Sequence, residues 1–410
     1  MADTPAAAVN VVCVASHYKG VEFLRECKRQ GAHVSLVTRE KALGEDWPRE
    51  ALDDIVAVPD EAGAEVLLHA VGHLSRKRRP HAVVALEEFD VVNAALVREH
   101  LLVPGMRATT ARKFRDKLTM RVVASGAGIR VPEFVHALNY EEVGQFMERV
   151  PPPWVLKPRS DVSAAGIRKL GEAEQVWRAI DELDARAALH DRSPYYLLER
   201  YVAGEVFHVD SLVEDGRVVF AGASRYGRPP MDVMHGGGVF TSYTVEYDSR
   251  ERGELLKANR KLLKSLGLES GAAHAEFIKG AEDGQLYFLE VAARVGGAYI
   301  AETLEAASGV NLWREWARAE VARAAGARSE AAEPRRDYSG IALSLARQER
   351  PDTSAYDDAE IVYRIAKPHH VGLIVRSPEL QRVRELLAQY AARFGADFCA
   401  VAPPPDRFGR

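Results

Sequence analysis

The sequence predicts a multidomain protein of mixed α/β and α+β character, on three observations. The first 38 residues have the pattern strand, helix, strand, which is the unit of a parallel sheet. Residues 274–291 have the pattern of two strands joined by a turn, which indicates an antiparallel pair. Residues 328–337 are polar and separate a strand-rich C-terminal segment from the rest. We therefore expect an N-terminal α/β domain, a central region and a small α+β C-terminal unit.

Length and composition are those of an ordinary globular protein. The 410 residues suffice for two or three domains, and 47% of them are hydrophobic and 28% charged. A formal net charge of −4 favours neither nucleic acid nor an anionic membrane as a partner. The three cysteines lack metal-ligand spacing, which indicates reduced thiols. With no signal pattern and no apolar run near ~20 residues, we expect a cytoplasmic protein that is not in a membrane.

The N-terminal domain is expected to have a Rossmann-like shape. Its loop at 16–20 lacks the G-x-G-x-x-G fingerprint, so we do not expect it to bind a nicotinamide cofactor. Glu87 and Glu88 follow the last predicted strand at its carboxyl end, where open α/β sheets bind ligands. Glu87 is therefore a candidate substrate contact, although two solvated loop glutamates fit the pattern equally. The predicted elements are strands at 9–15, 33–38, 55–58 and 81–86 and helices at 21–30 and 61–78.

The segment 274–297 brings two carboxylates close to an arginine. If the turn at 282–284 has three residues with glycine last, Glu276 lies directly opposite Glu290. Opposed side chains have Cβ atoms about 4.5–5.5 Å apart, where like charges destabilise the pair. A divalent cation between them removes that cost, and oxygen ligands suit Mg²⁺. A two-residue turn would put the glutamates on opposite faces, and an exposed hairpin with solvated glutamates fits the spacing equally.

The same segment resembles the metal-binding core of the ATP-grasp superfamily. There, glutamates on two adjacent strands and an arginine four residues later hold Mg²⁺ and the reacting phosphate. The resemblance assigns Glu276 and Glu290 to the metal and Arg294 to the phosphate. Many members have Asn-Pro where this chain has Ala292-Ala293, so the usual third metal ligand is missing. Bacterial L-amino-acid ligases, which make dipeptides, are similar in having small residues there.

The resemblance also implies a set of phosphate-binding residues. Lys117, in a helix expected at 112–125, and Lys157, at the end of a strand at 154–157, match the lysines that contact the nucleotide phosphates. The loop that follows is expected to fold over the β- and γ-phosphates. Its small residues Ser160, Ser163 and Gly166 suit a close backbone approach. A flexible surface hairpin has the same composition.

The segment 196–210 resembles the adenine-binding hinge of the superfamily. Glu199 and the backbone from Arg200 to Val202 are expected at the hydrogen-bonding edge of the purine. Glu205 is expected to accept from the ribose hydroxyls, since carboxylates are good acceptors. His208 is included as a nucleotide contact, although a structural histidine fits equally well.

A Gly- and Pro-rich segment at 224–240 falls where family members have a substrate-facing loop. His235, Gly236 and Gly237 are therefore candidate substrate contacts, with an ordinary hairpin link as the alternative. Gly297, just after the arginine motif, is a further candidate. The resemblance divides the chain into an N-terminal domain at 1–108, small and large ATP-grasp subdomains at 109–203 and 204–327, and an α+β unit at 328–410. The later elements are helices at 299–307, 311–325 and 378–394 and strands at 338–346, 361–365 and 371–375.

The function implied is that of an ADP-forming ligase that joins a carboxylate to an amine through an acyl phosphate. An amino acid is the expected substrate, and the expected cofactors are ATP and two Mg²⁺ ions, with Mn²⁺ as a substitute. Arg294 and Lys157 are the expected catalytic residues, and a homodimer is the usual assembly among similar ligases. The alternatives are a carboxyphosphate-forming carboxylase or purine-pathway enzyme, and a catalytically silent ATP-binding regulator. The sequence does not name the acid, the amine, the product or a third metal ligand.

Overall fold

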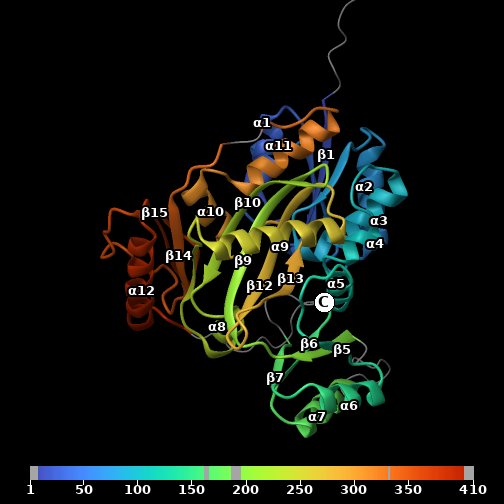
Figure 1. Ribbon diagram of the computed structural model, residues 1–410. Coiled ribbons are helices and arrows are strands. Elements are labelled where there is room, and N and C mark those ends of the chain that lie inside the picture. Colours follow the sequence, from blue (N-terminus) through green and yellow to red (C-terminus); the bar gives the residue numbers. More distant parts are fainter. Residues whose placement is uncertain (1–7, 161–165, 186–194, 331–332, 401–410) are drawn as a thin grey trace, which may run out of the picture.

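The structure is a computed structural model that describes residues 8–160, 166–185, 195–330 and 333–400. Within these residues the strands form three sheets. Figure 1 shows a large central body with the N-terminal part (blue) and the C-terminal part (red) at its two sides, and a smaller green lobe below. Among the described helices, none is both long and apolar enough to cross a membrane.

The N-terminal sheet has four parallel strands in the order β3-β2-β1-β4. Helices cover both faces of β1, which explains its uninterrupted apolar run. The expected strands and helices all form, although the helix expected at 61–78 is shorter. The elements are β1 (Asn10–Ala15), α1 (Val21–Arg29), β2 (His33–Arg39), η1 (Glu40–Ala42), η2 (Arg49–Ala51), β3 (Asp54–Val58), α2 (Ala64–Ser75), β4 (Ala82–Ala85), η3 (Glu88–Asp90) and α3 (Val91–Leu101).

The predicted helix at 112–125 is wrong in its extent, because the segment forms two helices, α4 (Ala108–Arg112) and α5 (Lys117–Gly126). Asp116 caps α5: its side chain accepts from the backbone N–H groups of Leu118 and Thr119, 3.0 and 3.3 Å away. A carboxylate at this position satisfies free N–H groups and favours a helix start there. Lys117 therefore occupies the first position of α5, and its backbone N–H donates to the carbonyl of Arg159 in the smaller lobe at 2.7 Å.

The smaller lobe is a four-stranded antiparallel sheet in the order β5-β8-β6-β7. Apolar side chains of two helices, among them Phe146 and Ile180, pack with Trp154 and Leu198 of the sheet. The lobe therefore has a core of its own. The elements are β5 (Phe134–His136), α6 (Tyr140–Arg149), β6 (Trp154–Pro158), β7 (Arg168–Leu170), α7 (Ala173–Ala185) and β8 (Tyr196–Arg200).

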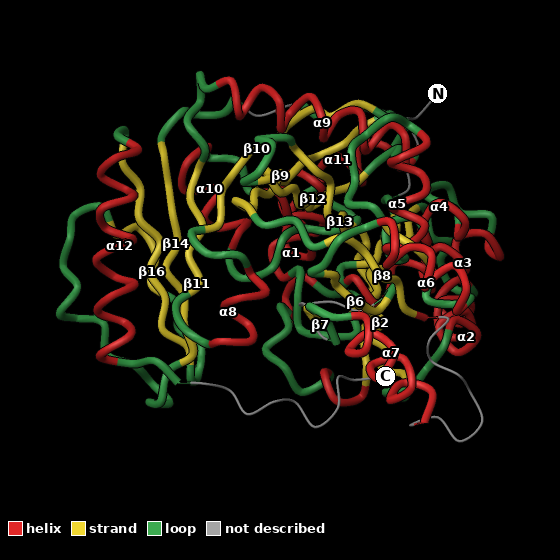
Figure 2. Tube along the Cα trace, turned by 60° about the horizontal axis from the view of Figure 1, so that its bottom comes forward, coloured by secondary structure: helices red, strands yellow, loops and turns green. Residues whose placement is uncertain are grey.

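The large sheet has eight strands in the order β13-β12-β9-β10-β11-β14-β16-β15. The strands expected in the C-terminal unit continue this sheet, because β14 pairs antiparallel with β11. Helix α12 lies along β14 and β16 (Figure 2). The elements are β9 (Gly204–Glu214), β10 (Arg217–Tyr226), α8 (Pro230–Gly236), β11 (Phe240–Thr244), α9 (Arg250–Leu266), β12 (Gly271–Gly280), β13 (Leu286–Ala292), α10 (Ile300–Ser308), α11 (Leu312–Ala324), β14 (Tyr338–Leu345), β15 (Ile361–Arg364), β16 (His370–Ser377) and α12 (Leu380–Asp397).

Helices α9 and α11 cover opposite faces of the central strands. Ala273 packs with α9, whereas its neighbour Ala272 packs with α11, as the alternation of side chains along a strand requires. On the α11 side, the Phe23 ring of α1 lies 5.0 Å from the Trp316 ring, edge to face. The N-terminal domain and the large sheet therefore share one apolar core.

The hairpin of β12 and β13 places Glu276 opposite Glu290, as predicted. The predicted three-residue turn is wrong, because the backbone N–H of Gly280 already donates to Gln285 and leaves four residues in the loop. If the residues of the two strands were then paired one to one from that loop, Glu276 and Glu290 would be offset by one position. A bulge at Leu289 supplies the missing residue and restores the pairing, since two residues of one strand then face one of the other.

Gly204→Ala should destabilise the fold, because a Cβ there would lie 2.0 Å from the carbonyl oxygen of Lys279 on β12. Backbone atoms cannot move aside like a flexible side chain, so we expect a loss of about 1–3 kcal/mol, as for overpacked positions. The matched control is Gly253→Ala in the exposed part of α9, where a Cβ meets nothing within 4 Å. That change should stabilise by about 0.5–1 kcal/mol. Denaturant unfolding of both variants measures the two shifts, and equal shifts would contradict the expectation.

Candidate functional site

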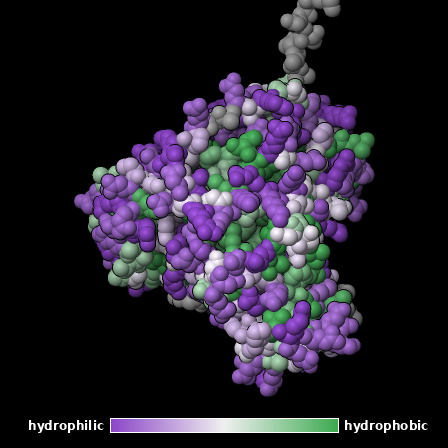
Figure 3. Space-filling view, in the orientation of Figure 1, coloured by the Kyte–Doolittle hydropathy of each residue, from purple (hydrophilic) through white to green (hydrophobic). Residues whose placement is uncertain are grey.

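A cavity of about 560 Å³ lies between the smaller lobe and the large sheet. Its walls come from α5, β6 and β8 on one side and from β12 and β13 on the other. Figure 3 shows a mostly hydrophilic surface with apolar residues near its centre and toward the smaller lobe. The structure brings ten of the predicted site residues to this cavity: Lys117, Lys157, Glu199, Arg200, Val202, Gly237, Glu276, Glu290, Arg294 and Gly297.

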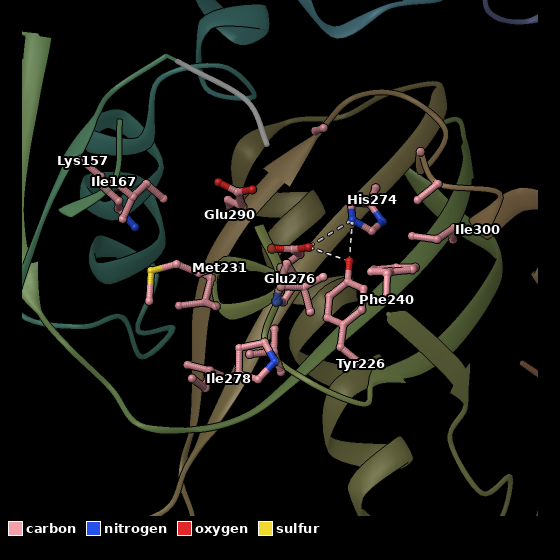
Figure 4. A pocket seen from close by; sticks show the side chains of 18 of the residues that line it. Lys157, Ile167, Tyr226, Met231, Phe240, His274, Glu276, Ile278, Glu290 and Ile300 are labelled. Carbon is pink, nitrogen blue, oxygen red and sulfur yellow. Dashed lines mark hydrogen bonds and ion pairs between the residues drawn. The ribbon is translucent and has the colours of Figure 1, made fainter. Parts of the chain in front are cut away.

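Glu276 and Glu290 both face this cavity (Figure 4). The ammonium group of Lys117 lies 3.0 Å from Oε2 of Glu290. Desolvation in the cavity would raise the pKa of Glu290, but the charges of Lys117 and Lys157 outweigh it and hold that pKa well below its usual range. The carboxylate is therefore ionised at neutral pH and available to a cation.

Glu199 joins the smaller lobe to α5. Its Oε1 pairs with the Lys157 ammonium group, and its Oε2 accepts from Nε of Arg121 at 3.0 Å. All three side chains are buried. Burial lowers the pKa of Lys157 to about 8, although Glu199 opposes the shift. Burial would raise the pKa of Glu199, but Arg121 and Lys157 outweigh it and lower that pKa.

Arg294 is held by a carboxylate of the N-terminal domain. Its Nη2 and Nε donate to Oε2 of Glu88 at 2.8 and 3.1 Å, and Nη1 donates to the Val295 carbonyl at 2.9 Å. Arg115 pairs with the other oxygen of Glu88. Because Glu88 precedes α3, the N-terminal domain sets the orientation of the Arg294 guanidinium at the cavity.

A buried chain of hydrogen bonds leads to Glu276. Asp210 lies between two imidazoles, 2.6 Å from Nδ1 of His208 and 2.8 Å from Nδ1 of His274. Nε2 of His274 lies 3.4 Å from Oε1 of Glu276, which also accepts from the Tyr226 hydroxyl at 2.7 Å. Burial would lower the pKa of His274, but Asp210 outweighs it and raises that pKa to about 10. The imidazolium and the hydroxyl therefore fix one oxygen of Glu276.

The hydrogen bonds around Asp210 and His274 leave room only for glycine at position 296. A Cβ there would lie 2.8 Å from Oδ1 of Asp210 and 3.1 Å from Nδ1 of His274. The backbone after Arg294 thus packs directly on the Asp210–His274 pair. The same contact holds the loop that carries Gly297 against the cavity.

Other predicted contacts lie away from this cavity. Glu87 is buried, and its Oε2 lies 2.6 Å from the ammonium group of Lys19, while its neighbour Glu88 lines the cavity. Glu205 is exposed and pairs with Arg225. His208 bonds to Asp210 and, through Nε2, to Ser242 at 2.7 Å, which is the structural role that the sequence left open. These contacts place Glu205 and His208 outside the cavity walls in this structure.

The remaining candidates lie in two segments, 160–166 and 235–237, and the second belongs mostly to helix α8 rather than to the loop that the sequence predicted. Ser160 is exposed, and its carbonyl accepts from Nη2 of Arg115 at 2.7 Å. Gly166 is exposed and has a φ of 69°, which glycine adopts without strain. Ser163 lies outside the described residues. His235 and Gly236 fall in α8, and Gly237, directly after that helix, lines the cavity.

Sequence reasoning missed Arg121 and the pair Asp210 and His274. Arg121 lies four residues after Lys117 on the same face of α5, and this spacing could have indicated it. His274 lies two residues before Glu276, so both side chains share a face of β12. The partner Asp210 lies on the neighbouring strand, directly opposite His274, and no local pattern reveals that pairing.

Comparison with known proteins finds a family whose model matches the part of the chain that carries this geometry. The model of the ATP-grasp domain matches residues 150–302, which include Lys157, Glu199, Glu276, Glu290 and Arg294. This segment of the chain is therefore similar to ATP-grasp domains.

Two similar proteins are amino acid ligases. The L-arginine-specific L-amino acid ligase of Bacillus subtilis is 22% identical over 300 residues, which are 72% of this chain and 70% of the relative. The crystal structure of an L-amino acid ligase from Bacillus licheniformis superposes with a TM-score of 0.71 at 16% identity, covering 97% of this chain and all of that one.

A third similar structure contains a nucleotide. It is the biotin carboxylase domain of the Hydrogenobacter thermophilus 2-oxoglutarate carboxylase, in complex with MgADP, ADP and bicarbonate. Its TM-score is 0.70 at 17% identity, covering 93% of this chain and 89% of that one. At these identities the two structural similarities show the fold alone.

The site residues present fit ATP and Mg²⁺. Two carboxylates on adjacent strands supply oxygen ligands that suit Mg²⁺, and the ammonium groups of Lys117 and Lys157 suit phosphate oxygens. Ala292, also at the cavity, offers no side-chain ligand. Among the predicted site residues, Glu276 and Glu290 are therefore the ones whose carboxylates would hold the metal.

Glu199→Gln should destabilise the protein by about 3–5 kcal/mol, because it leaves two buried cations without their charged partner. Glu254→Gln is the matched control: Glu254 forms an exposed pair with Arg250 one helical turn away, and its loss should cost under about 0.5 kcal/mol. Denaturant unfolding at pH 7 measures both. A small effect at position 199 would mean that Arg121 and Lys157 do not depend on this carboxylate.

Proposed function

We propose that this ATP-grasp protein is an ADP-forming ligase that activates a carboxylate as an acyl phosphate and couples it to an amine. The supporting observation is the single cavity where Glu276 and Glu290 lie opposite each other beside Lys117, Lys157 and Arg294. The similarity to amino acid ligases supports an amino acid as one substrate. The product would then be a dipeptide or another amide.

The chain contributes charge and orientation to this reaction. When bound, Mg²⁺–ATP supplies the phosphoryl group and a Lewis acid. Joining two anions is the physical difficulty of the first step, and Lys117 and Lys157 would offset the repulsion at the phosphate oxygens. Arg294 would hold the transferred phosphoryl group through its planar fork of donors. Glu276 and Glu290 would hold the metal, with His274 and Tyr226 fixing the orientation of Glu276.

Several finer features belong to the same proposal. We propose two Mg²⁺ ions, with Mn²⁺ as a substitute, and adenine held by Glu199 and the backbone from Arg200 to Val202. The domains would be a Rossmann-like unit at 1–108, ATP-grasp subdomains at 109–203 and 204–327, and an α+β unit at 328–410. We further propose a cytoplasmic homodimer that binds neither nucleic acid nor membranes.

Glu290→Gln should lower metal-dependent ADP formation by about 10²–10³ or more, because it removes a carboxylate that would hold Mg²⁺ at the phosphoryl group. The amide keeps the shape of the side chain, so the fold should persist. ADP release from Mg²⁺-ATP, measured over pairs of amino acids with mass spectrometry of the products, gives the rate and the substrates. Glu254→Gln on α9 is the control and should keep full activity. A Glu290→Gln protein with unchanged turnover would refute the proposal.

Arg294→Lys should lower kcat by about 10²–10³ while Mg²⁺-ATP binding changes little. Lysine keeps the charge but loses the fork that grips a phosphoryl group and Glu88 together. Steady-state kinetics and calorimetric binding of a non-hydrolysable ATP analogue separate the two effects. Equal loss of binding and turnover would show instead that Arg294 serves the ground-state nucleotide.

A further inference from the structure

The cavity continues past the two glutamates, away from the lysines. Figure 4 shows Tyr226, Phe240 and Ile300 on one side of Glu276, with Lys157 and Ile167 on the other. Phe240 pairs across strands with Leu343, and the Phe240 and Tyr226 rings lie 5.5 Å apart. We name this part of the cavity the apolar subsite; its residues are Tyr226, Phe240, Ile300, Leu343 and Leu345.

The apolar subsite lies where the substrates of the proposed ligase must meet the phosphoryl group. The lysines and the hinge occupy the lobe side, so the nucleotide would fill that side of the cavity. The space on the far side of Glu276 and Arg294 is then left for the acid and the amine. Its walls come from β10, β11, α10 and β14.

The carboxylates of the cavity are already engaged, as far as the described residues extend. Glu88 pairs with Arg294 and Arg115, and Glu290 with Lys117. Glu199 and Glu276 also have the partners described above. A cationic substrate side chain would find no free carboxylate here, and burying an unpaired charge is costly.

Polar lining at this end comes from neutral or basic side chains. Ser344 and His370 line the cavity near Leu343 and Leu345. The Ser344 hydroxyl is already bonded, since it donates to the Leu345 carbonyl at 3.0 Å. The environment therefore favours an apolar side chain, which gains free energy from burial in proportion to its area.

We propose that the apolar subsite binds the side chain of one of the two substrates, and that this substrate is an amino acid with an apolar side chain of the size of leucine, methionine or phenylalanine. This inference rests on the proposed ligase function. The proposed preference for an apolar side chain also differs from that of the arginine-specific relative, whose substrate carries a guanidinium.

The first test compares substrates on the unaltered protein. Mg²⁺-ATP is offered with all pairs of amino acids, and ADP, phosphate and product masses are measured. Pairs containing leucine, methionine or phenylalanine should exceed pairs built only from arginine, lysine or glutamate by about 10- to 200-fold in kcat/KM, as for apolar pockets. Turnover confined to basic or acidic amino acids would overturn the apolar subsite while leaving the ligase function intact. Absence of turnover with every pair would overturn both.

The second test changes the subsite itself. Leu343→Glu should reverse the preference toward arginine or lysine, because it supplies the missing carboxylate. Val362→Glu places the same change on exposed β15 and is the matched control, which should keep the original preference. A folded Leu343→Glu protein that keeps the leucine-to-arginine ratio of the unaltered protein would contradict the proposal.

Phe240→Leu covers the case in which a buried charge prevents folding. It keeps the subsite apolar but enlarges it, so the preference should move by about tenfold toward side chains larger than that of leucine. An unchanged size preference in this variant would also contradict the proposal. Circular dichroism of each variant confirms that the compared proteins are folded.

Discussion

The guanidinium of Arg121 links helix α5 to the smaller lobe and to strand β13, and the candidate site depends on all three. It is fully buried, donates to Glu199 of the smaller lobe and to the carbonyl of Leu289, and lies over the Phe288 ring at 5.7 Å. The bulge takes Leu289 out of the strand ladder, and a buried carbonyl without a donor would be costly. Arg121 supplies that donor. The bulge that aligns Glu276 with Glu290 is therefore satisfied by the same side chain that anchors the hinge.

Charge pairing explains why the cavity tolerates so many charged side chains. Buried charges are stable only when they are paired and hydrogen-bonded, and each carboxylate described here has a cationic or hydroxyl partner. A bound nucleotide with its metal would replace these pairs with equivalent ones. The cation would take the place of Lys117 beside Glu290, and Lys117 would pair with a phosphate instead. The site is therefore arranged for an anion and a cation together, which is the composition of Mg²⁺-ATP.

The sequence predicted the phosphoryl-transfer side of the site better than the substrate side. Lys117, Lys157, Glu276, Glu290 and Arg294 lie at element ends or at fixed spacings, where local pattern determines position. The Glu276–Glu290 register was predicted correctly from a wrong turn, because a longer loop and the Leu289 bulge cancel each other. No sequence signal marks a bulge, so that agreement was not secure.

The misplaced contacts have physical reasons of their own. Glu205 and His208 were assigned to the nucleotide because their segment resembles the adenine-binding hinge, and such a resemblance does not fix the partner of each side chain. Arg225, on the neighbouring strand β10, pairs with Glu205, whereas Asp210, two residues further along β9, binds His208. The adjacent glutamates differ for the same reason: Lys19 engages Glu87, and Arg294 engages Glu88. Pairings between distant segments appear only when the sheets are assembled.

The extension of the large sheet divides the candidate site into two parts with different determinants. The metal and phosphate side chains stand on α5, β6, β12 and β13 and just after β13, and hydrogen bonds and ion pairs fix these elements to one another. The apolar subsite stands on β10, β11, α10 and β14, and its residues contribute volume and shape, except for Tyr226, whose hydroxyl also donates to Glu276. Apolar side chains on these strands can change in size at the cost of local repacking, without disturbing the ionic network around Glu276. In such an arrangement, substrate preference can vary while phosphoryl chemistry stays the same.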